Sequence, residues 1–389
     1  MIQPFLKRHR KLRFCSNQAK ASGFTLVELL VAMIVASLIS AGLLFMVVQL
    51  VQTNLREAAR SDTQRDLQAA LDYIARDVRE AVYVYDASCL LDRPTSANAT
   101  TSINALSCPG LRNYLPTRIT GSSGFGYTDS NGTNIPVLAF WRLNPLPPSV
   151  NTLCQNFATS YSQRNSRPPE VQGVACLAGQ MYSLVVYSLN NSKGGAVTKG
   201  RARIMRYELP QFTSQTVLSP GTAPTPIPGW VDPRGKASDG NNTSFLTWPV
   251  SQAMLNNTST LPVPNPRPSD SNVSNQPLTD FVDWNGLYNL SSNPVTVGQA
   301  TNRSSGSGST TENLILTPAD GTSGSPPRGF HVYVRGAQSG GSLNQQVVIR
   351  IQGDAAGRPG VPDLTPNRPV VPISLETTVL TRGVTNKTQ

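Results

Sequence analysis

The N-terminal part of the chain carries one long helical pattern of apolar positions. Leu29–Val48 is a run of 20 residues without a charge. As an α-helix such a run is about 30 Å long, the thickness of the hydrocarbon core of a membrane. An apolar stripe at steps of three and four residues continues from Leu55 to Val82. This pattern predicts a helix from Phe24 to about Tyr85 whose first half, at about residues 29–48, spans a membrane.

Beyond residue 86 the pattern changes to short segments of β-branched and aromatic residues between turn-rich loops. Because these segments do not alternate with helices, they predict an antiparallel sheet and an α+β fold. We expect the second half of the helix to pack on this sheet rather than form a coiled-coil stalk, because its stripe is not a regular heptad. The expected strands are 137–141, 181–188, 201–209, 329–334, 345–351 and 371–380.

The distribution of proline supports a boundary after the helix. Of the 31 prolines, 30 follow residue 93. We therefore expect a leader at 1–23, a long helix at 24–86 and a β-rich head at 87–389. A Pro-, Ser-, Asn- and Gly-rich insertion at about 210–327 is expected to be mostly extended loops, although Asp280–Trp284 reads as ordered.

The net charge of +11 is concentrated at the N-terminus. Six basic residues and no acidic residue lie in the first 23 positions, and the rest of the chain has only a modest positive excess. Basic residues that flank a membrane helix remain cytoplasmic, so they indicate topology and a nucleic-acid partner is not expected. A conventional secretory signal is the alternative, but its apolar core is shorter and a small-residue cleavage site follows it.

Glu28 is an acidic residue at the start of the apolar run. A carboxylate in a membrane costs about 2.5–3.5 kcal/mol or more unless it is paired. Cleavage between Gly23 and Phe24 would provide a cation, the new α-amino group of Phe24. This amine could pair with Glu28 of the same helix or of a neighbouring copy, and the second arrangement would set the register between helices.

The segment Gly23-Phe-Thr-Leu-Val-Glu28-Leu-Leu30 behind a basic leader resembles the prepilin cleavage and methylation motif of type IV pilins and pseudopilins. The resemblance implies that Gly23 is the cleavage residue, Phe24 the N-methylated terminus and Glu28 the assembly carboxylate. It also implies a prepilin peptidase, an inner-membrane assembly platform and other pilins as partners. A proline that many major pilins carry within this helix is absent, because Phe45 and Met46 stand in that region.

A helix followed by a sheet with variable insertions is similar to W-type minor pilins and J-type pseudopilins. The stretches Gln68–Val78 and Ile135–Trp141 resemble cyanobacterial members, in particular pseudopilins of hormogonium polysaccharide secretion. This resemblance implies a single-pass protein of the cytoplasmic membrane with a cytoplasmic leader and a periplasmic head. The protein would then enter a pilus or pseudopilus.

The five cysteines divide by compartment. Cys15 lies in the leader, while Cys89, Cys108, Cys154 and Cys176 lie in the head, outside the cytoplasm, where disulfides persist. Four cysteines allow three connectivities. Pairing of sequence neighbours would close two loops of about 20 residues, each stabilising the fold by roughly 3 kcal/mol. Free thiols are the alternative, and a metal site of cysteines alone is not expected because the spacings are too wide.

No catalytic motif is found, and neither a cofactor nor a metal is expected. His331 lies in an expected strand and is interpreted as a sheet residue. The stretch 129–134 could offer oxygen ligands to Ca²⁺ but lacks the glutamate of a complete loop, so a β-turn is preferred. A basic cluster could contact DNA or an acidic polysaccharide, although a solvated strand edge is the commoner arrangement. Its members are Lys193, Lys199, Arg201, Arg203 and Arg206.

Two hypotheses for function remain. The first is a non-catalytic structural subunit, a minor pilin or pseudopilin that helps to initiate or cap a type IV pilus-like filament or secretion machine. This machine could serve polysaccharide secretion and motility. The second is a monomeric membrane-anchored glycan-binding protein or enzyme.

Overall fold

The structure is a computed structural model, and it describes 23–90, 108–111, 114–116, 127–129, 132–158, 168–191, 202–257, 276–284, 314–318, 328–335, 345–361 and 373–381. The chain divides into two units, 1–54 and 55–389. The leader before Gly23 and the Ser304–Ser309 stretch lie outside the described residues.

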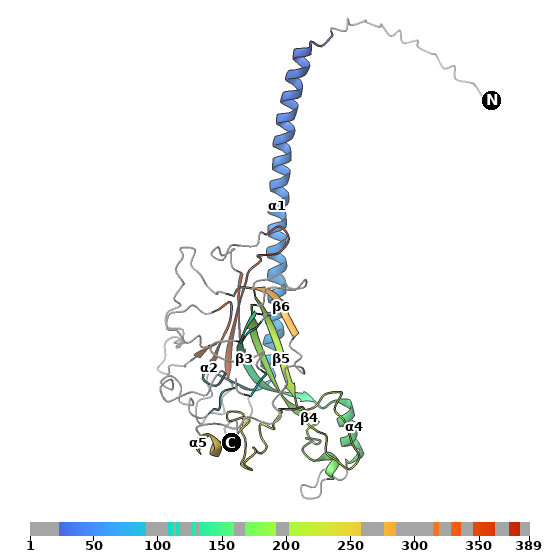
Figure 1. Cartoon of the computed structure of the whole chain (residues 1–389), viewed down its shortest axis with the longest axis vertical. Coiled ribbons are helices and arrows are strands. Elements are labelled where there is room, and N and C mark those ends of the chain that lie inside the picture. Colours follow the sequence, from blue (N-terminus) through green and yellow to red (C-terminus); the bar gives the residue numbers. More distant parts are fainter. Residues whose placement is uncertain are drawn as a thin grey trace, which may run out of the picture. The chain divides into compact units, whose positions relative to one another are not determined.

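The long N-terminal helix is present. Helix α1 extends from Leu26 to Arg79 and is labelled in Figure 1. It ends earlier than the expected Tyr85, because the chain turns at Glu80, whose N–H donates to the carbonyl of Asp77 (3.2 Å). The residues that follow form a strand, β1. They were expected at the end of the helix, because the apolar stripe continues through them. Valine and tyrosine suit a strand as well as a helix face, so apolar spacing alone does not separate the two.

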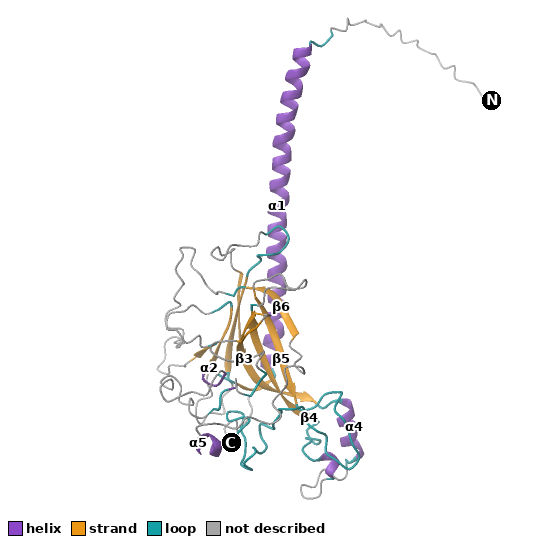
Figure 2. Ribbon diagram, viewed as in Figure 1, coloured by secondary structure: helices purple, strands orange, loops and turns teal. Residues whose placement is uncertain are grey.

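Within the described ranges, ten strands form one antiparallel sheet. Its order is β1-β3-β4-β5-β6-β9-β8-β7, with β10 beside β9 and β2 beside β3. All six expected strands are confirmed, and the fold is α+β (Figure 2). The strands are β1 (Ala81–Val84), β2 (Tyr127–Asp129), β3 (Gly132–Pro145), β4 (Gln180–Asn190), β5 (Ala202–Pro210), β6 (Gln276–Val282), β7 (Leu314–Thr317), β8 (Phe330–Arg335), β9 (Gln346–Gly353) and β10 (Ile373–Leu380).

The head-bound part of α1 packs against one face of this sheet. Its buried positions include Leu67, Leu71, Ile74 and Val78, which form one core with alternate residues of the strands. On β4, Val185, Tyr187 and Leu189 face this core, as the period of two along a strand requires. The expected packing of the helix on the chain's own sheet is thus confirmed.

The opposite face of the sheet is covered by residues 211–257, which we call the flap. This segment has little regular structure apart from α5 (Gln252–Asn257). Phe245 and Trp248 of the flap are nonetheless buried with Trp141 of β3 in a second core. The flap is therefore loop-rich, as its composition suggested, but it is packed on the sheet rather than free of it. Its few aromatic residues supply the apolar area that anchors it.

A smaller lobe lies between β3 and β4. It contains α4 (Pro148–Asn156) and a 3₁₀ turn at Pro169–Val171. Leu146, Val150 and Val174 of the lobe form a small core with Phe212 of the flap. This helix was not expected from the sequence.

A buried ionic network joins the end of α1 to three strands. The Asp77 carboxylate accepts hydrogen bonds from Arg142 of β3, from Tyr187 Oη of β4 (2.6 Å) and from Arg206 Nε of β5 (2.9 Å). The guanidinium of Arg206 also donates to Glu208 (2.7 Å). Burial and the Asp77 carboxylate raise the pKa of Tyr187, which therefore remains a donor.

His331 is a buried residue of β8, as expected. Its Nδ1 lies 2.7 Å from the carbonyl oxygen of Arg328. Burial lowers the pKa of His331 to about 4, and the nearby Arg350 guanidinium acts in the same direction.

Replacing Asp77 with alanine should destabilise the head by about 3 kcal/mol, because two largely buried guanidinium groups would lose their shared anion. Unfolding of the detergent-solubilised chain in guanidinium chloride measures this loss of stability. Asp72→Ala is the matched control, since Asp72 is an exposed aspartate of the same helix. Equal losses in the two variants would contradict the assigned role of the network.

The buried His331 should make the head less stable in acid. Its pKa is about 4 in the folded chain and 6.5 in the unfolded chain, so between these values only the unfolded chain binds the proton. The contribution of neutral His331 to the free energy of unfolding is fully present above pH 6.5 and is lost as the pH falls to 4. The total is about 3 kcal/mol.

Unfolding free energies at pH 7 and pH 4 should therefore differ less in His331→Asn than in the unaltered chain. Identical pH dependence in the two would show that His331 is not responsible.

Candidate functional site

The candidate site is the start of α1. Gly23, Phe24 and Thr25 precede the helix, which begins at Leu26. The Glu28 N–H lies 3.3 Å from Thr25 Oγ1 and 3.0 Å from the Thr25 carbonyl. Thr25 therefore occupies the N-cap position, and Thr25 with Glu28 has the sequence form of a capping box.

The cap bears on one expectation from the sequence. Cleavage after Gly23 was expected to leave Phe24 and Glu28 as residues i and i+4 on one helix face. In the structure of the full chain Phe24 precedes the helix, and the arrangement after cleavage stays a prediction. The signal for Thr25 was present in the sequence, because Thr-x-x-Glu before an apolar run is typical of a helix start.

Glu28 lies in the first turn of α1 and is exposed. The unpaired N–H groups at a helix start carry a partial positive charge, which favours a carboxylate there by about 0.3–1 kcal/mol. This is smaller than the cost of a carboxylate in a membrane. A further cation is therefore required before Glu28 is compensated in lipid.

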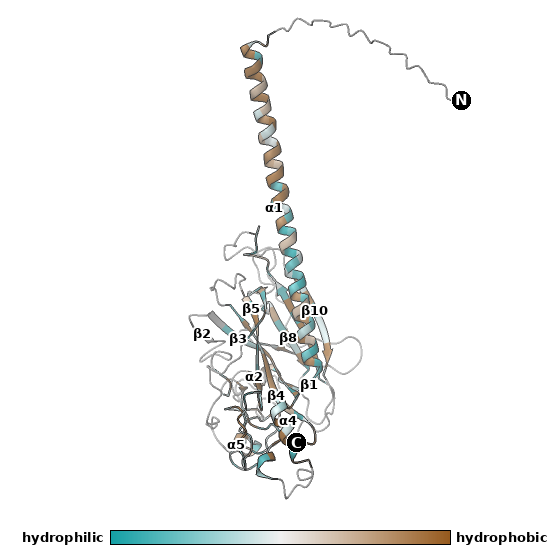
Figure 3. Ribbon diagram, turned by 90° about the vertical axis from the view of Figure 1, so that its right-hand side faces the viewer, coloured by the Kyte–Doolittle hydropathy of each residue, from teal (hydrophilic) through white to brown (hydrophobic). Residues whose placement is uncertain are grey.

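The apolar run that follows is exposed throughout. Every residue from Gly23 to Ala58 is exposed, including Phe24, whose relative exposure is 78%. Figure 3 shows the apolar colouring along the N-terminal half of α1. Within the described residues, α1 is the helix long and apolar enough to cross a membrane. Such a helix is consistent with a membrane anchor.

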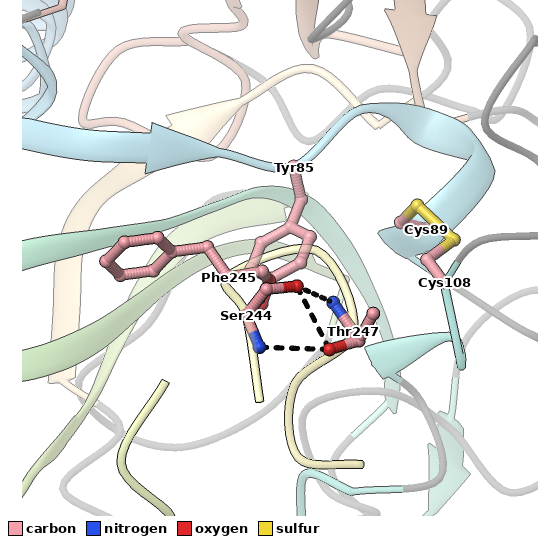
Figure 4. Close-up of a disulfide and its surroundings, with 6 residues drawn as sticks. All are labelled: Tyr85, Cys89, Cys108, Ser244, Phe245 and Thr247. Carbon is pink, nitrogen blue, oxygen red and sulfur yellow. Dashed lines mark hydrogen bonds between the residues drawn. A yellow bond between two sulfur atoms is a disulfide. The ribbon is translucent and has the colours of Figure 1, made fainter. Parts of the chain in front are cut away.

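The four cysteines of the head are paired as sequence neighbours. Cys89 pairs with Cys108, with Cα atoms 5.7 Å apart, and Cys154 pairs with Cys176, with Cα atoms 5.4 Å apart. Figure 4 shows the first pair together with Tyr85 and Phe245. The Tyr85 Oη donates a hydrogen bond to the Phe245 carbonyl (2.7 Å). The free-thiol alternative therefore does not describe this structure. The first disulfide fixes the chain after β1 next to the flap, and the second closes the lobe.

The two described members of the basic cluster, Arg203 and Arg206, do not lie on a solvated strand edge. β5 lies between β4 and β6, so it is an interior strand. Arg206 belongs to the Asp77 network, and Arg203 is buried, which lowers its pKa against the opposing effect of Asp280. Lys193, Lys199 and Arg201 lie outside the described residues.

The stretch expected to form a β-turn is partly described. Asp129 of β2 pairs with Gly132 of β3, as in a hairpin. Ser130 and Asn131, between them, lie outside the described residues.

The comparisons with known proteins concern the start of α1. Residues 18–44 match the family model of the prokaryotic N-terminal methylation motif. This motif points to a type IV pilin-like or pseudopilin protein, and it suggests processing by prepilin peptidase and assembly into filaments. The match includes Gly23, Phe24 and Glu28. No curated protein and no solved structure matches the chain.

Proposed function

We propose that this protein is a non-catalytic minor pilin or pseudopilin that helps to initiate or cap a type IV pilus-like filament. The methylation motif at 18–44 carries this proposal. Gly23 and Phe24 lie within this match and directly before an exposed apolar helix, which supports the proposal. Glu28 is the single charged residue between Lys20 and Arg56, so the run has one position at which a cation would be stabilised.

In this proposal the chain is first held in the cytoplasmic membrane as a single-pass protein. The basic leader remains in the cytoplasm because positive flanks are retained there. The head then lies in the periplasm, an oxidising compartment in which the two disulfides are stable. Membrane retention requires no partner, because an apolar span of about 20 residues is sufficient.

Cleavage after Gly23 by prepilin peptidase then supplies the missing cation. The new amine on Phe24, which is subsequently methylated, remains protonated and can pair with Glu28 of a subunit already in the filament. Apolar contact between neighbouring helices has no preferred axial position, whereas a charge pair in lipid does. The pair therefore sets the axial register, while the apolar residues of α1 supply the contact area.

The composition of the head favours a minor rather than a major subunit. The flap and the lobe enlarge the head beyond the sheet that packs on the helix, which suits a unit present in few copies at a filament end. The resemblance of Gln68–Val78 and Ile135–Trp141 to cyanobacterial pseudopilins favours polysaccharide secretion over protein secretion. The competing proposal, a monomeric anchored glycan-binding protein or enzyme, requires neither cleavage nor Glu28.

The mature protein should begin at N-methyl-Phe24 when the N-terminus is analysed by mass spectrometry. Gly23→Val should leave the leader attached. Gly42→Val is the matched control, because a Cβ built at either glycine has open space around it, so neither change disturbs the folded head. An uncleaved Met1 terminus in the unaltered protein would eliminate the proposal.

Glu28→Gln should still be cleaved and retained in the membrane, but its amount in the filament fraction should fall at least tenfold. The reason is that the lost charge pair contributes about 1.4 kcal/mol or more to the free energy of assembly. Glu57→Gln, an exposed glutamate beyond the apolar run, should assemble normally. The measurement is the ratio of filament to membrane protein by immunoblot. Normal assembly of Glu28→Gln would show that Glu28 does not set the register, whereas absence of the unaltered protein from the filament fraction would support the monomeric anchor.

A further inference from the structure

The end of β9 and the loop that follows it contact α1 between Leu55 and Leu67, where the helix meets the head. We call residues Gly353–Val361 the strap; Figure 2 shows this loop beside α1. A Cβ at Gly353 would collide with Leu67, and a Cβ at Gly360 would collide with Leu55. Because Gly360 also has φ +82°, glycine suits this position on two grounds. The strap backbone therefore lies directly against α1 at two places.

One side chain adds a polar contact between the strap and the helix. The Arg358 guanidinium forms an ion pair with the Asp66 carboxylate of α1. The same guanidinium lies over the ring of Phe281 on β6, with Cζ 4.2 Å from the ring centroid. The Asp354 N–H also donates to the carbonyl of Phe281 (2.8 Å). Arg358 thus joins the first held turns of α1 to the sheet.

The helix face near the strap is buried through small residues. Ala59 is the first buried residue of α1, and Thr63 is the next. Thr63 Oγ1 donates to the Ala59 carbonyl of its own helix (2.8 Å), so it does not bond to the sheet. The large apolar residues that bind α1 to the sheet begin only at Leu67. The turns between Leu55 and Asp66 therefore lack the large apolar contacts that hold the rest of the buried helix.

The ion pair of the strap is also more accessible to water than the Asp77 network. The Asp66 side chain is 53% exposed, whereas that of Asp77 is 7% exposed. Exposed ion pairs are weak and are screened by salt, whereas buried pairs are screened less. The contact at Arg358 should therefore open before the contact at Asp77.

We propose that the strap is a conformational latch that sets how many turns of α1 the head holds. With Arg358 on Asp66, the head holds the helix from Leu55. When this contact opens, the head holds it from about Leu67, and the turns between become free while the sheet and the Asp77 network remain intact. This proposal stands independently of the proposed function, since it requires no filament.

Hydrogen exchange of the full chain in detergent, read by mass spectrometry, tests the latch. Arg358→Ala should accelerate exchange of amides 55–66 by about tenfold and leave residues 70–79 unchanged. Arg350→Ala is a matched control, because Arg350 also pairs with a carboxylate, Glu376, and lies 5.5 Å from the ring centroid of Tyr333. It should leave amides 55–66 unchanged. Unaltered exchange of these amides in Arg358→Ala, or equal acceleration throughout the head, would overturn the proposal.

A second variant separates the latch from a general loss of stability. Asp66→Asn changes an exposed side chain and should accelerate the same amides. The double variant should exchange no faster than Arg358→Ala alone, because both changes break one contact. Salt should accelerate exchange in the unaltered chain but not in Arg358→Ala. Additive effects, or the same salt response in both proteins, would contradict the latch.

Discussion

The attachment of α1 to the sheet depends on the pairing of Asp77. Apolar burial supplies most of the favourable free energy, but it is non-directional and tolerates sliding of the helix. A buried carboxylate is different, because it is costly unless it is paired and hydrogen-bonded. Arg142, Tyr187 and Arg206 come from three adjacent strands and meet at this one group. A shift of the helix by one turn would separate all of these donors from their acceptor, so the network fixes the axial position of α1.

The two parts of α1 meet different physical requirements with one backbone. From Leu26 to Val51 the side chains are apolar on all sides, which suits lipid or the helices of other subunits. From Leu55 to Arg79 one stripe is apolar and the rest is charged, which suits a helix with one face on a sheet. Glu28 breaks the first pattern, and Asp77 breaks the second. Glu28 lies in the apolar segment and Asp77 lies on the buried face of the helix. A carboxylate is costly in either environment unless it is paired with a cation.

Elements that depend on local pattern could be predicted from the sequence. The six strands and the long helix follow from periodicity, and pairing of neighbouring cysteines needs only short loops, whereas the cleavage junction at Gly23–Phe24 stays a prediction. The partners of Asp77 could not be predicted, because Arg206 is distant in sequence and only the folded sheet brings it near. The packing of the flap on the sheet could not be predicted for the same reason: its core contacts are a few aromatic residues, such as Phe245 and Trp248, within a loop-rich composition. The Thr25 cap was readable but was overlooked.

Within the described part of the chain, the short strand β1 has one neighbouring strand, and a side chain bonds to its other edge. β1 pairs with β3, and its other edge would otherwise present open backbone groups. The side-chain amide of Gln345 donates to the Val84 carbonyl (2.7 Å), and its Oε1 accepts from the Val84 N–H (2.8 Å). One side chain thus supplies the two hydrogen bonds that a neighbouring strand would make. Because β1 directly follows α1, this contact joins the helix end to the start of β9, whose other end leads into the strap. The same strand therefore helps to hold α1 at both ends of its head-bound part.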